Sequence, residues 1–345
     1  MRIASDFRVI FFQLIYAGLI TTLFLSLPYS KDNKNILHNK DIWRSKQWIL
    51  IQNPFDNKKA LVSRYGGSEV RFRLENSKQI SIRASSSNHA FDQGISVDID
   101  GTRYQVETPE IDKKTLDIKL PVHKGTHQYE VIIRHHCAGS THPCDLWLKE
   151  IAVDISAKIY PPVSHPEQTI AFLGDSISVG FSENNYTYLV AERMGMLLHN
   201  ASVFGSRIGR KEGWDSVQDR LQKDVINYQP DILVVALGTN DLYDNISELA
   251  FRELYAKLIR DIRSGTPDTQ IITLALFNRR DISEFRIRQF NYIINSIASE
   301  NDITHVDPFH WLSHADLVDG VHPSLKSQEK IAEHMYRAIV HLRED

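Results

Sequence analysis

Apolar and polar residues alternate with period two along much of the first half of the chain, from about residue 58 to 160. Such alternation predicts β-strands with one buried face. The expected strands read SEVRFRLE, KQISIRA, ISVDID, TRYQVE, TLDIKL, HQYEVIIR and LWLKEIAV. Asp100-Gly101 stands between two of them and indicates a tight hairpin. Many short strands without a long helical pattern predict an antiparallel, jelly-roll-like β-sandwich over residues 58–162, with residues 31–57 as a linker before it.

The pattern changes after residue 168, where short and nearly continuous apolar runs alternate with helical stretches. The runs are TIAFLG, HNASVFG, DILVVALG, QIITLALF and THVDPF, and the helical stretches lie at about 186–196, 214–227, 247–264, 284–300 and 324–342. Strands buried on both faces that alternate with helices indicate a doubly wound parallel sheet. Residues 163–345 are therefore expected to form an α/β domain of the flavodoxin-like kind.

The N-terminal residues 1–30 contain an uncharged apolar run at 9–27, VIFFQLIYAGLITTLFLSL. This run is long enough to cross a bilayer as a helix, and longer than the usual apolar core of a signal peptide. Cleavage after Ser26 would place Phe24 where a small residue is required. An uncleaved membrane anchor is thus favoured over a cleaved signal peptide, with a buried core helix as the remaining alternative. A secreted or membrane-anchored protein, in the periplasm or at the cell surface, is expected.

Composition excludes several classes of protein. Of the 345 residues, 42% are apolar and 24% are charged, which is typical of a soluble globular protein and not of a disordered chain, a collagen-like repeat or a polytopic membrane protein. Forty Lys and Arg residues against 43 Asp and Glu residues leave a formal charge of −3. Without a basic cluster, so weak a field argues against nucleic acid as a partner.

The chain has two cysteines, Cys137 and Cys144, at the ends of the polar segment CAGSTHPC. A disulfide between them is the favoured interpretation, because an oxidising compartment would keep it closed. Free thiols are the second interpretation. Zinc binding with His135, His136 or His142 is the third, but the spacing lacks the C-x2-C and H-x3-H patterns of common zinc sites.

Polar and glycine residues follow the buried strands at the end where ligands bind to such sheets. Gly174–Ser178 (GDSIS), Gly205, Gly238–Asp241 (GTND) and Asp319–Pro323 (DGVHP) stand there in this order. Each segment alone is also typical of an ordinary turn or helix start. Together they supply what acyl transfer requires.

Ser176 is the candidate nucleophile in these loops, and His322 is the candidate base that takes its proton. Asp319 can accept a hydrogen bond from the other ring nitrogen. The oxyanion of a tetrahedral intermediate needs preorganised donors, which the Ser176 and Gly205 amides and the Asn240 side chain can provide.

The four segments, in this order, resemble the motif blocks of the SGNH (GDSL-type) hydrolases, over residues 168–345. The whole arrangement is similar to carbohydrate esterase family two, in which a β-sandwich precedes the SGNH domain; LPVHKGTHQYEVII and GDSISVGF add to this resemblance. It implies Ser176 as nucleophile, His322 as base and Asp319 as its orienting partner, with Gly205 and Asn240 completing the oxyanion hole. The glycine block reads FGSRIGRKEGW and departs from the family's Ser-Gly-x-Gly form, which leaves Gly209 as the alternative to Gly205.

Three further residues are weaker candidates for substrate contacts. Trp311 can stack on a sugar, Arg279 lies at another strand end, and Asn184 follows the nucleophile loop. Core packing, a solvated loop and helix capping are the respective alternatives.

The expected protein is a serine esterase that removes O-linked acetyl groups from a polysaccharide or oligosaccharide through an acyl-enzyme. The mechanism needs no metal and no organic cofactor. A lipase or thioesterase of the same superfamily is one alternative, and a catalytically silent carbohydrate-binding protein is the other.

Overall fold

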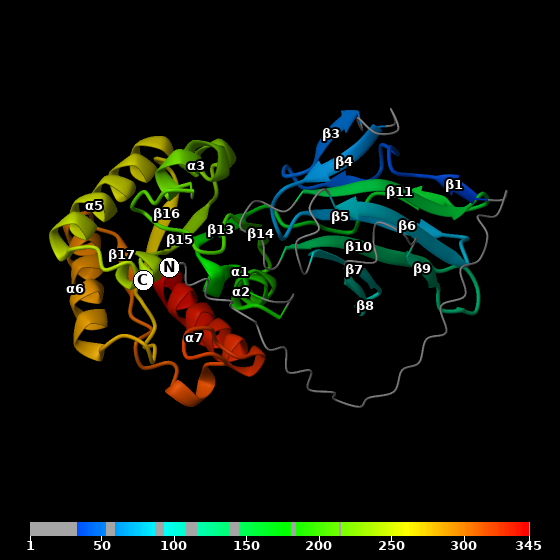
Figure 1. Cartoon of the computed structure of the whole chain (residues 1–345). Coiled ribbons are helices and arrows are strands. Elements are labelled where there is room, and N and C mark those ends of the chain that lie inside the picture. Colours follow the sequence, from blue (N-terminus) through cyan, green and yellow to red (C-terminus); the bar gives the residue numbers. More distant parts are fainter. Residues whose placement is uncertain are drawn as a thin grey trace, which may run out of the picture. The chain divides into compact units, whose positions relative to one another are not determined.

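The computed structural model describes most of the chain beyond its N-terminal segment (Figure 1). The described residues are 33–52, 59–86, 93–107, 116–137, 145–180, 184–213 and 215–344. The apolar run at 9–27 lies outside them, so the expected signal peptide or membrane anchor stays a prediction. Among the helices within the described ranges, none combines the length and the apolar character of a membrane span.

Two antiparallel sheets form the first half of the described chain. One contains, in spatial order, β3 (Ile49–Gln52), β4 (Lys59–Ser63), β11 (Leu146–Asp154), β6 (Gln79–Ser86) and β9 (Leu116–Lys119), and β1 (Asn33–Asn35) also pairs with β11. The other contains β12 (Lys158–Tyr160), β5 (Glu69–Glu75), β10 (Gln128–Cys137), β7 (Gln93–Ile99) and β8 (Thr102–Glu107), and β2 (Trp43–Arg44) pairs with β5. Both sheets contribute to one apolar core, which includes Phe72, Ile133 and Ile151. The predicted antiparallel sandwich is confirmed.

The sequence pattern locates the seven expected strands but misses others. Residues 31–57 were expected to be a linker, and this is wrong in their described part, because β1, β2 and β3 pair with strands of the two sheets. The first two are at most three residues long, and β3 is exposed along its whole length. Neither kind of strand produces a period-two burial pattern, so alternation could not reveal them.

The hairpin expected at Asp100-Gly101 joins β7 to β8. Both turn residues have positive φ, 48° at Asp100 and 80° at Gly101. A two-residue turn of type I′ requires this conformation at both positions. The turn places Asp100 at the tip of the hairpin.

A five-stranded parallel sheet forms the second half of the chain (Figure 1). Its spatial order is β14 (Leu197–Asn200), β13 (Thr169–Gly174), β15 (Ile232–Ala236), β16 (Gln270–Leu274) and β17 (Thr304–Val306). The helices α3 (Val217–Asp224), α5 (Glu248–Gly265) and α6 (Glu284–Glu300) share one core, and α2 (Tyr186–Met194) and α7 (Leu325–Glu344) share another. Along β13, Leu173 belongs to the first core and Phe172 to the second, so helices cover both faces. The expected doubly wound sheet is confirmed.

The strand expected at HNASVFG lies closer to the N-terminus than predicted. β14 covers Leu197–Asn200, so the chain has left the sheet well before Gly205. The Asn200 side chain donates to the Ser178 carbonyl at 3.0 Å and accepts from the Ser202 amide at 3.1 Å. These polar contacts end the strand although the apolar pattern continues.

Cys137 is the last residue of β10, and Cys144 lies outside the described residues. The disulfide therefore stays a prediction. Thiol titration of the unreduced, unfolded protein is expected to find no free thiol, and reduction is expected to release two. Two titratable thiols before reduction would contradict the pairing.

Three buried histidines make the fold sensitive to acid. His135 and His136 lie in β10, and His199 lies in β14. Burial lowers the pKa of His135 and His136 to about 3 and that of His199 to about 4. The unfolded chain takes up protons at these side chains near pH 6.5, whereas the folded chain does not. Stability is therefore lost as the pH falls from about 6.5 toward the folded-state values.

Replacing His199 with glutamine is expected to reduce this loss. A buried neutral histidine costs about 1.4 kcal/mol of stability for each pH unit below its unfolded pKa. The drop in unfolding free energy between pH 7 and pH 5 should thus be smaller by about 2 kcal/mol in His199→Gln. The glutamine amide can replace Nε2 of His199, which donates to the Asp224 carbonyl at 2.7 Å. Urea unfolding at both pH values measures the effect, with the exposed His310→Gln as the control. An unchanged drop in His199→Gln would contradict the assignment.

Candidate active site

Ser176 is the first residue of the short helix α1 (Ser176–Val179), which follows β13 directly. Asp175 caps this helix by accepting a hydrogen bond from the Ile177 amide at 3.0 Å. A Cβ atom at Gly174 would lie 2.3 Å from Oγ of Ser178, so only glycine fits this turn from strand to helix. Because Ser176 is the first residue of the helix, its backbone N–H has no hydrogen-bond acceptor within the helix.

His322 and Asp319 come from the loop before α7. Nε2 of His322 lies 2.9 Å from Oγ of Ser176, and its Nδ1 lies 2.7 Å from Oδ2 of Asp319. The other carboxylate oxygen accepts from the amides of Val321 and His322 at 3.0 and 2.8 Å. Partial burial acts to raise the pKa of Asp319, but these hydrogen bonds outweigh it and hold the pKa below its usual range. The three expected residues form a continuous hydrogen-bonded chain.

The sheet explains why these loops meet. The strand order reverses between β13 and β15, because the chain leaves β13 toward β14 on one side and returns to β15 on the other. Ser176 follows β13, and Asn240 follows β15 in the short helix α4 (Thr239–Tyr243). Open α/β sheets bind ligands at this reversal, beyond the carboxyl ends of the strands.

Asn240 of α4 is hydrogen-bonded to the loop that carries Gly205. Nδ2 of Asn240 donates to the Ser206 carbonyl at 3.1 Å. A carboxamide carries two N–H bonds, so the second can serve another acceptor. Gly205 has a φ of 66°, which glycine adopts without strain. Within the part of the chain that the structure describes, its amide donates no hydrogen bond.

Asp241 fixes the loop that follows Gly205. Its buried carboxylate accepts from the amides of Ile208 and Gly209 at 3.1 and 2.8 Å. Burial raises the pKa of Asp241, and these two hydrogen bonds act in the opposite direction. Because the Gly209 amide is already engaged, Gly205 is the glycine of the two whose amide is available to a ligand.

Asp175 is a buried carboxyl group next to the candidate nucleophile, with 1% of its surface exposed. Burial raises the pKa of Asp175 to about 6, although the Ile177 amide and the charges of His322 and Arg279 favour ionisation. At pH 7 this side chain is therefore mostly ionised and adds negative charge close to the chain of Ser176, His322 and Asp319.

Arg279 and Arg280 follow β16 and contact the loops of the site. Arg279 is buried, pairs with Asp281 at 2.6 Å and donates to the Thr239 carbonyl at 3.2 Å, next to Asn240. The Arg280 amide donates to the Gly320 carbonyl at 2.9 Å, between Asp319 and His322 in sequence. Both arginines thus support loops, and a direct contact of Arg279 with substrate stays a prediction.

The other two candidates for substrate contacts occupy different settings. Trp311 stacks on His334 of α7, with ring centroids 4.9 Å apart, and lies edge-on to Phe277. These are packing contacts against the helix. Asn184 is exposed, just before Asn185, which caps α2. A role in substrate binding stays a prediction for both Trp311 and Asn184.

Sequence reasoning missed the supporting residues Asp175, Asp241 and Arg280. Each of the two aspartates stands within a motif whose neighbouring residue was singled out, but nothing in the sequence indicates that its side chain turns inward. Arg280 contacts the Gly320 carbonyl through its backbone amide, and its side chain donates to the His314 carbonyl. The backbone contact does not depend on residue type, so the sequence could not indicate it.

Residues 172–330 match the family model described as GDSL-like Lipase/Acylhydrolase. None of the curated proteins matches the sequence significantly.

Solved structures with the same fold are numerous, and three illustrate their range. A family two carbohydrate esterase from Cellvibrio japonicus has a TM-score of 0.70 at 17% identity, covering 90% of this chain and 98% of its own. A family two carbohydrate esterase from Clostridium thermocellum, in complex with cellohexaose, has a TM-score of 0.68 at 16% identity, covering 88% and 99%. An acetyl xylan esterase from the rumen bacterium Butyrivibrio proteoclasticus has a TM-score of 0.62 at 15% identity, also covering 88% and 99%.

Because these identities are low, the structural matches show only that the fold is shared. The family-model match covers the segment that carries the four loops. Residues 172–330 therefore resemble the GDSL-like lipase/acylhydrolase family, and the chain has the two-part fold of the family two carbohydrate esterases.

Proposed function

We propose that this protein is a serine esterase that removes O-linked acetyl groups from a polysaccharide or oligosaccharide. The observation that carries the proposal is the hydrogen-bonded chain from Ser176 through His322 to Asp319. It lies beyond the carboxyl ends of the strands where their order reverses. A silent carbohydrate-binding protein would have no need of an ordered serine, base and carboxylate.

In the proposed mechanism, Oγ of Ser176 attacks the ester carbonyl carbon while Nε2 of His322 takes its proton. Asp319, ionised at neutral pH, holds the imidazole through Nδ1 and stabilises the imidazolium. The sugar oxygen then leaves with the proton from His322, and the acyl group stays on Ser176. Water repeats the sequence, with His322 as base again, and releases the carboxylic acid.

The carbonyl oxygen becomes an oxyanion at both tetrahedral stages. We assign its donors to the Ser176 amide, the Gly205 amide and the second N–H of Asn240. The Ser206 carbonyl holds the first N–H of Asn240, so the amide is oriented before substrate arrives. Donors fixed in advance need no reorganisation in the transition state, which is why they stabilise it strongly.

A carbohydrate substrate is supported by two observations. The structural neighbours include family two carbohydrate esterases, one of them solved with cellohexaose and another described as an acetyl xylan esterase. In addition, Tyr243 is 62% exposed, one turn after Asn240 in α4, and the Arg279 guanidinium lies 5.6 Å from the centre of its ring. An exposed ring of this kind can stack on a sugar face.

A series of esters tests the proposed substrate class. We expect kcat/KM for p-nitrophenyl esters to fall about tenfold or more from acetate to butyrate, and to be very low for octanoate. A longer chain gains about 0.8 kcal/mol per methylene only where an apolar slot receives it. The segments SENNY, GSRIGRKEGW, GTNDLYDN and NRRDISE, which follow the strands in the sequence, are instead polar and aromatic, and polar groups resist desolvation.

Acetylated sugars are expected to react faster than simple alkyl acetates, because hydroxyl contacts can orient the ester. Ser176→Ala, assayed in parallel, shows how much hydrolysis comes from this site. Faster cleavage of octanoate than of acetate would contradict the acetylesterase and favour the lipase or thioesterase alternative. No hydrolysis of any ester would favour the carbohydrate-binding alternative.

We also propose that the protein works outside the cytoplasm, secreted or anchored through residues 9–27. The uncharged run at 9–27 and the expected pairing of Cys137 with Cys144 support this location. Fractionation of cells that express the full chain tests it. Recovery of the protein in the soluble cytoplasmic fraction, with both thiols reduced, would contradict it.

A further inference from the structure

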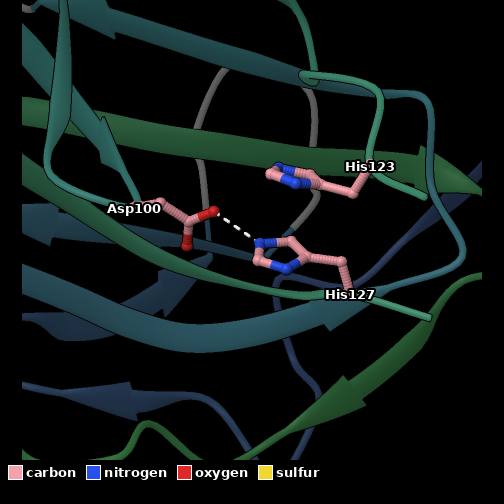
Figure 2. Close-up of side chains that lie close together, drawn as sticks. All are labelled: Asp100, His123 and His127. Atoms are coloured by element: carbon pink, nitrogen blue, oxygen red, sulfur yellow. Dashed lines mark hydrogen bonds and ion pairs between the residues drawn. The ribbon is translucent and has the colours of Figure 1, made fainter. Parts of the chain in front are cut away.

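Away from the active site, three side chains with metal-ligating atoms meet at the sandwich (Figure 2). Asp100 stands at the tip of the β7–β8 hairpin, and His123 and His127 lie in the loop between β9 and β10. One ligand atom from each residue lies within 4.8 Å of the other two. From this convergence we propose that Asp100, His123 and His127 form a binding site for Zn²⁺. The proposal does not depend on the proposed esterase activity.

The arrangement already brings nitrogen and oxygen ligands together. Nε2 of His127 lies 2.7 Å from Oδ2 of Asp100. The rings of His123 and His127 are stacked, with centroids 3.8 Å apart and planes inclined by 21°. Figure 2 shows the two imidazoles one above the other, with the Asp100 carboxylate beside them. Two imidazoles and a carboxylate thus share one small volume, although the three residues come from two separate segments.

The ligand-atom distances allow a metal ion, although zinc binding would require the two imidazole rings to leave their stacked arrangement, because a bound metal lies in the plane of each ring. Zinc binds imidazole nitrogen and carboxylate oxygen at about 2.1 Å, which places neighbouring ligands of a tetrahedral site about 3.4 Å apart. The pair formed by His127 and Asp100 would open by less than about 1 Å from 2.7 Å. No pair starts more than 4.8 Å apart, so none would need to close by more than about 1.4 Å.

Neighbouring residues hold Asp100 and His127 in place. The second oxygen of Asp100 accepts from the Glu130 amide at 2.8 Å, and the Asp100 amide donates to the Glu130 carbonyl at 3.0 Å. The ring of Tyr129 lies edge-on to His127 at 4.7 Å, and its hydroxyl donates to the Pro121 carbonyl. Contacts of this kind orient metal ligands and strengthen binding.

The loop between the histidines is shaped to bring them together. Three residues separate His123 from His127, and Gly125 among them has a φ of 83°. This conformation favours glycine. The chain therefore reverses between the two histidines, so that their rings stack instead of pointing apart.

The ligand types indicate which ion fits. Imidazole nitrogen suits Zn²⁺ and its neighbours in the first transition row, whereas Ca²⁺ and Mg²⁺ require sites built mainly of oxygen. Three protein ligands at a partly exposed position leave a fourth place for water. Bound zinc would join the β7–β8 turn to the loop before β10, and its effect is expected on the stability of the sandwich.

Calorimetric titration of Zn²⁺ into the metal-stripped full chain, prepared without a histidine tag, tests the proposal. Wild type is expected to bind one equivalent at this site and to show a higher Tm with Zn²⁺. His123→Ala and Asp100→Asn should each weaken this binding by at least about 100-fold. Asparagine accepts the positive φ of the turn and keeps an oxygen for the Glu130 amide, so Asp100→Asn preserves the hairpin. His310→Ala, at an exposed histidine elsewhere, is the matched control.

Loss of one equivalent and of the zinc-dependent rise in Tm in both variants, but not in His310→Ala, would support the site. Equal zinc binding by wild type and both variants would show that any zinc binds elsewhere, and the proposal would be wrong. It would also be wrong if wild type took up no Zn²⁺ at micromolar concentrations. Far-UV circular dichroism of each variant confirms that the sandwich is folded.

Discussion

Replacing Ser176 with alanine is expected to lower kcat/KM for an acetyl ester by at least about 10⁴-fold, to the level that oriented binding alone sustains. The substitution removes the oxygen that would bond to the acyl carbon, while the Ser176 amide and the loops around it stay. The fold should be unaffected, because the hydroxyl's hydrogen-bond partner is His322, which is itself partly exposed. Rates of acetate release measure the effect, and thermal unfolding confirms that the protein is intact.

Ser178→Ala is the matched control for this prediction. Ser178 lies in the same short helix, but its hydroxyl is buried and lies 2.6 Å from the Tyr186 hydroxyl. Its loss should cost about 1 kcal/mol of stability and leave catalysis largely unchanged. A fluorophosphonate probe should label wild type and Ser178→Ala but not Ser176→Ala. Activity retained by Ser176→Ala would show that another residue is the nucleophile.

Replacing Asn240 with alanine is expected to lower kcat by about 10²–10³-fold with little change in KM. The side chain would donate to the oxyanion, which exists in the tetrahedral stages and not in the bound ester. Its loss should therefore affect the transition state far more than substrate binding. Steady-state kinetics on one acetyl ester separates the two parameters.

The Asn240 side chain also contacts the Ser206 carbonyl, so the same variant loses one structural hydrogen bond. That loss is expected to cost about 1 kcal/mol of stability, which unfolding experiments measure separately from kcat. Asn227→Ala, at an exposed asparagine before β15, is the control and should leave both parameters unchanged. A rise in KM at constant kcat would assign Asn240 to ground-state binding instead.

The sequence predicts the parallel sheet well because its strands are buried on both faces. Runs such as TIAFLG and DILVVALG contain almost no polar residue, and the helices between them are amphipathic and long. The prediction fails where a polar side chain intervenes, as at Asn200, because hydrogen bonds of one residue outweigh the preference of the apolar residues that follow it.

The sequence indicates the candidate catalytic residues, but it does not indicate the residues that hold their loops in place. Ser176, His322 and Asp319 stand in motifs that the chemistry requires, and the structure brings them into hydrogen-bond contact. The proposed choice of Gly205 over Gly209 depends on the structure, because Asp241 engages the Gly209 amide. Such a contact depends on the path of a loop and not on residue type.

The residues of the proposed zinc site also come together through the path of the chain, which the sequence does not indicate. His123 and His127 are four positions apart in the sequence, and no metal was expected there. Their third partner lies on a different hairpin. Asp100 was recognised only as a turn residue. The turn that its conformation allows is also what brings its carboxylate to the histidines.

The contact between Asp241 and the loop after Gly205 has a consequence for how this enzyme can be varied. The carboxylate binds the main-chain amides of Ile208 and Gly209, which every residue type except proline can supply. The exposed side chains of Arg210 and Lys211 can thus differ without loss of these contacts, whereas Arg207 and Ile208 are buried. A library that randomises Arg210 and Lys211 and retains Asp241 should yield altered substrate ranges without loss of the oxyanion donors.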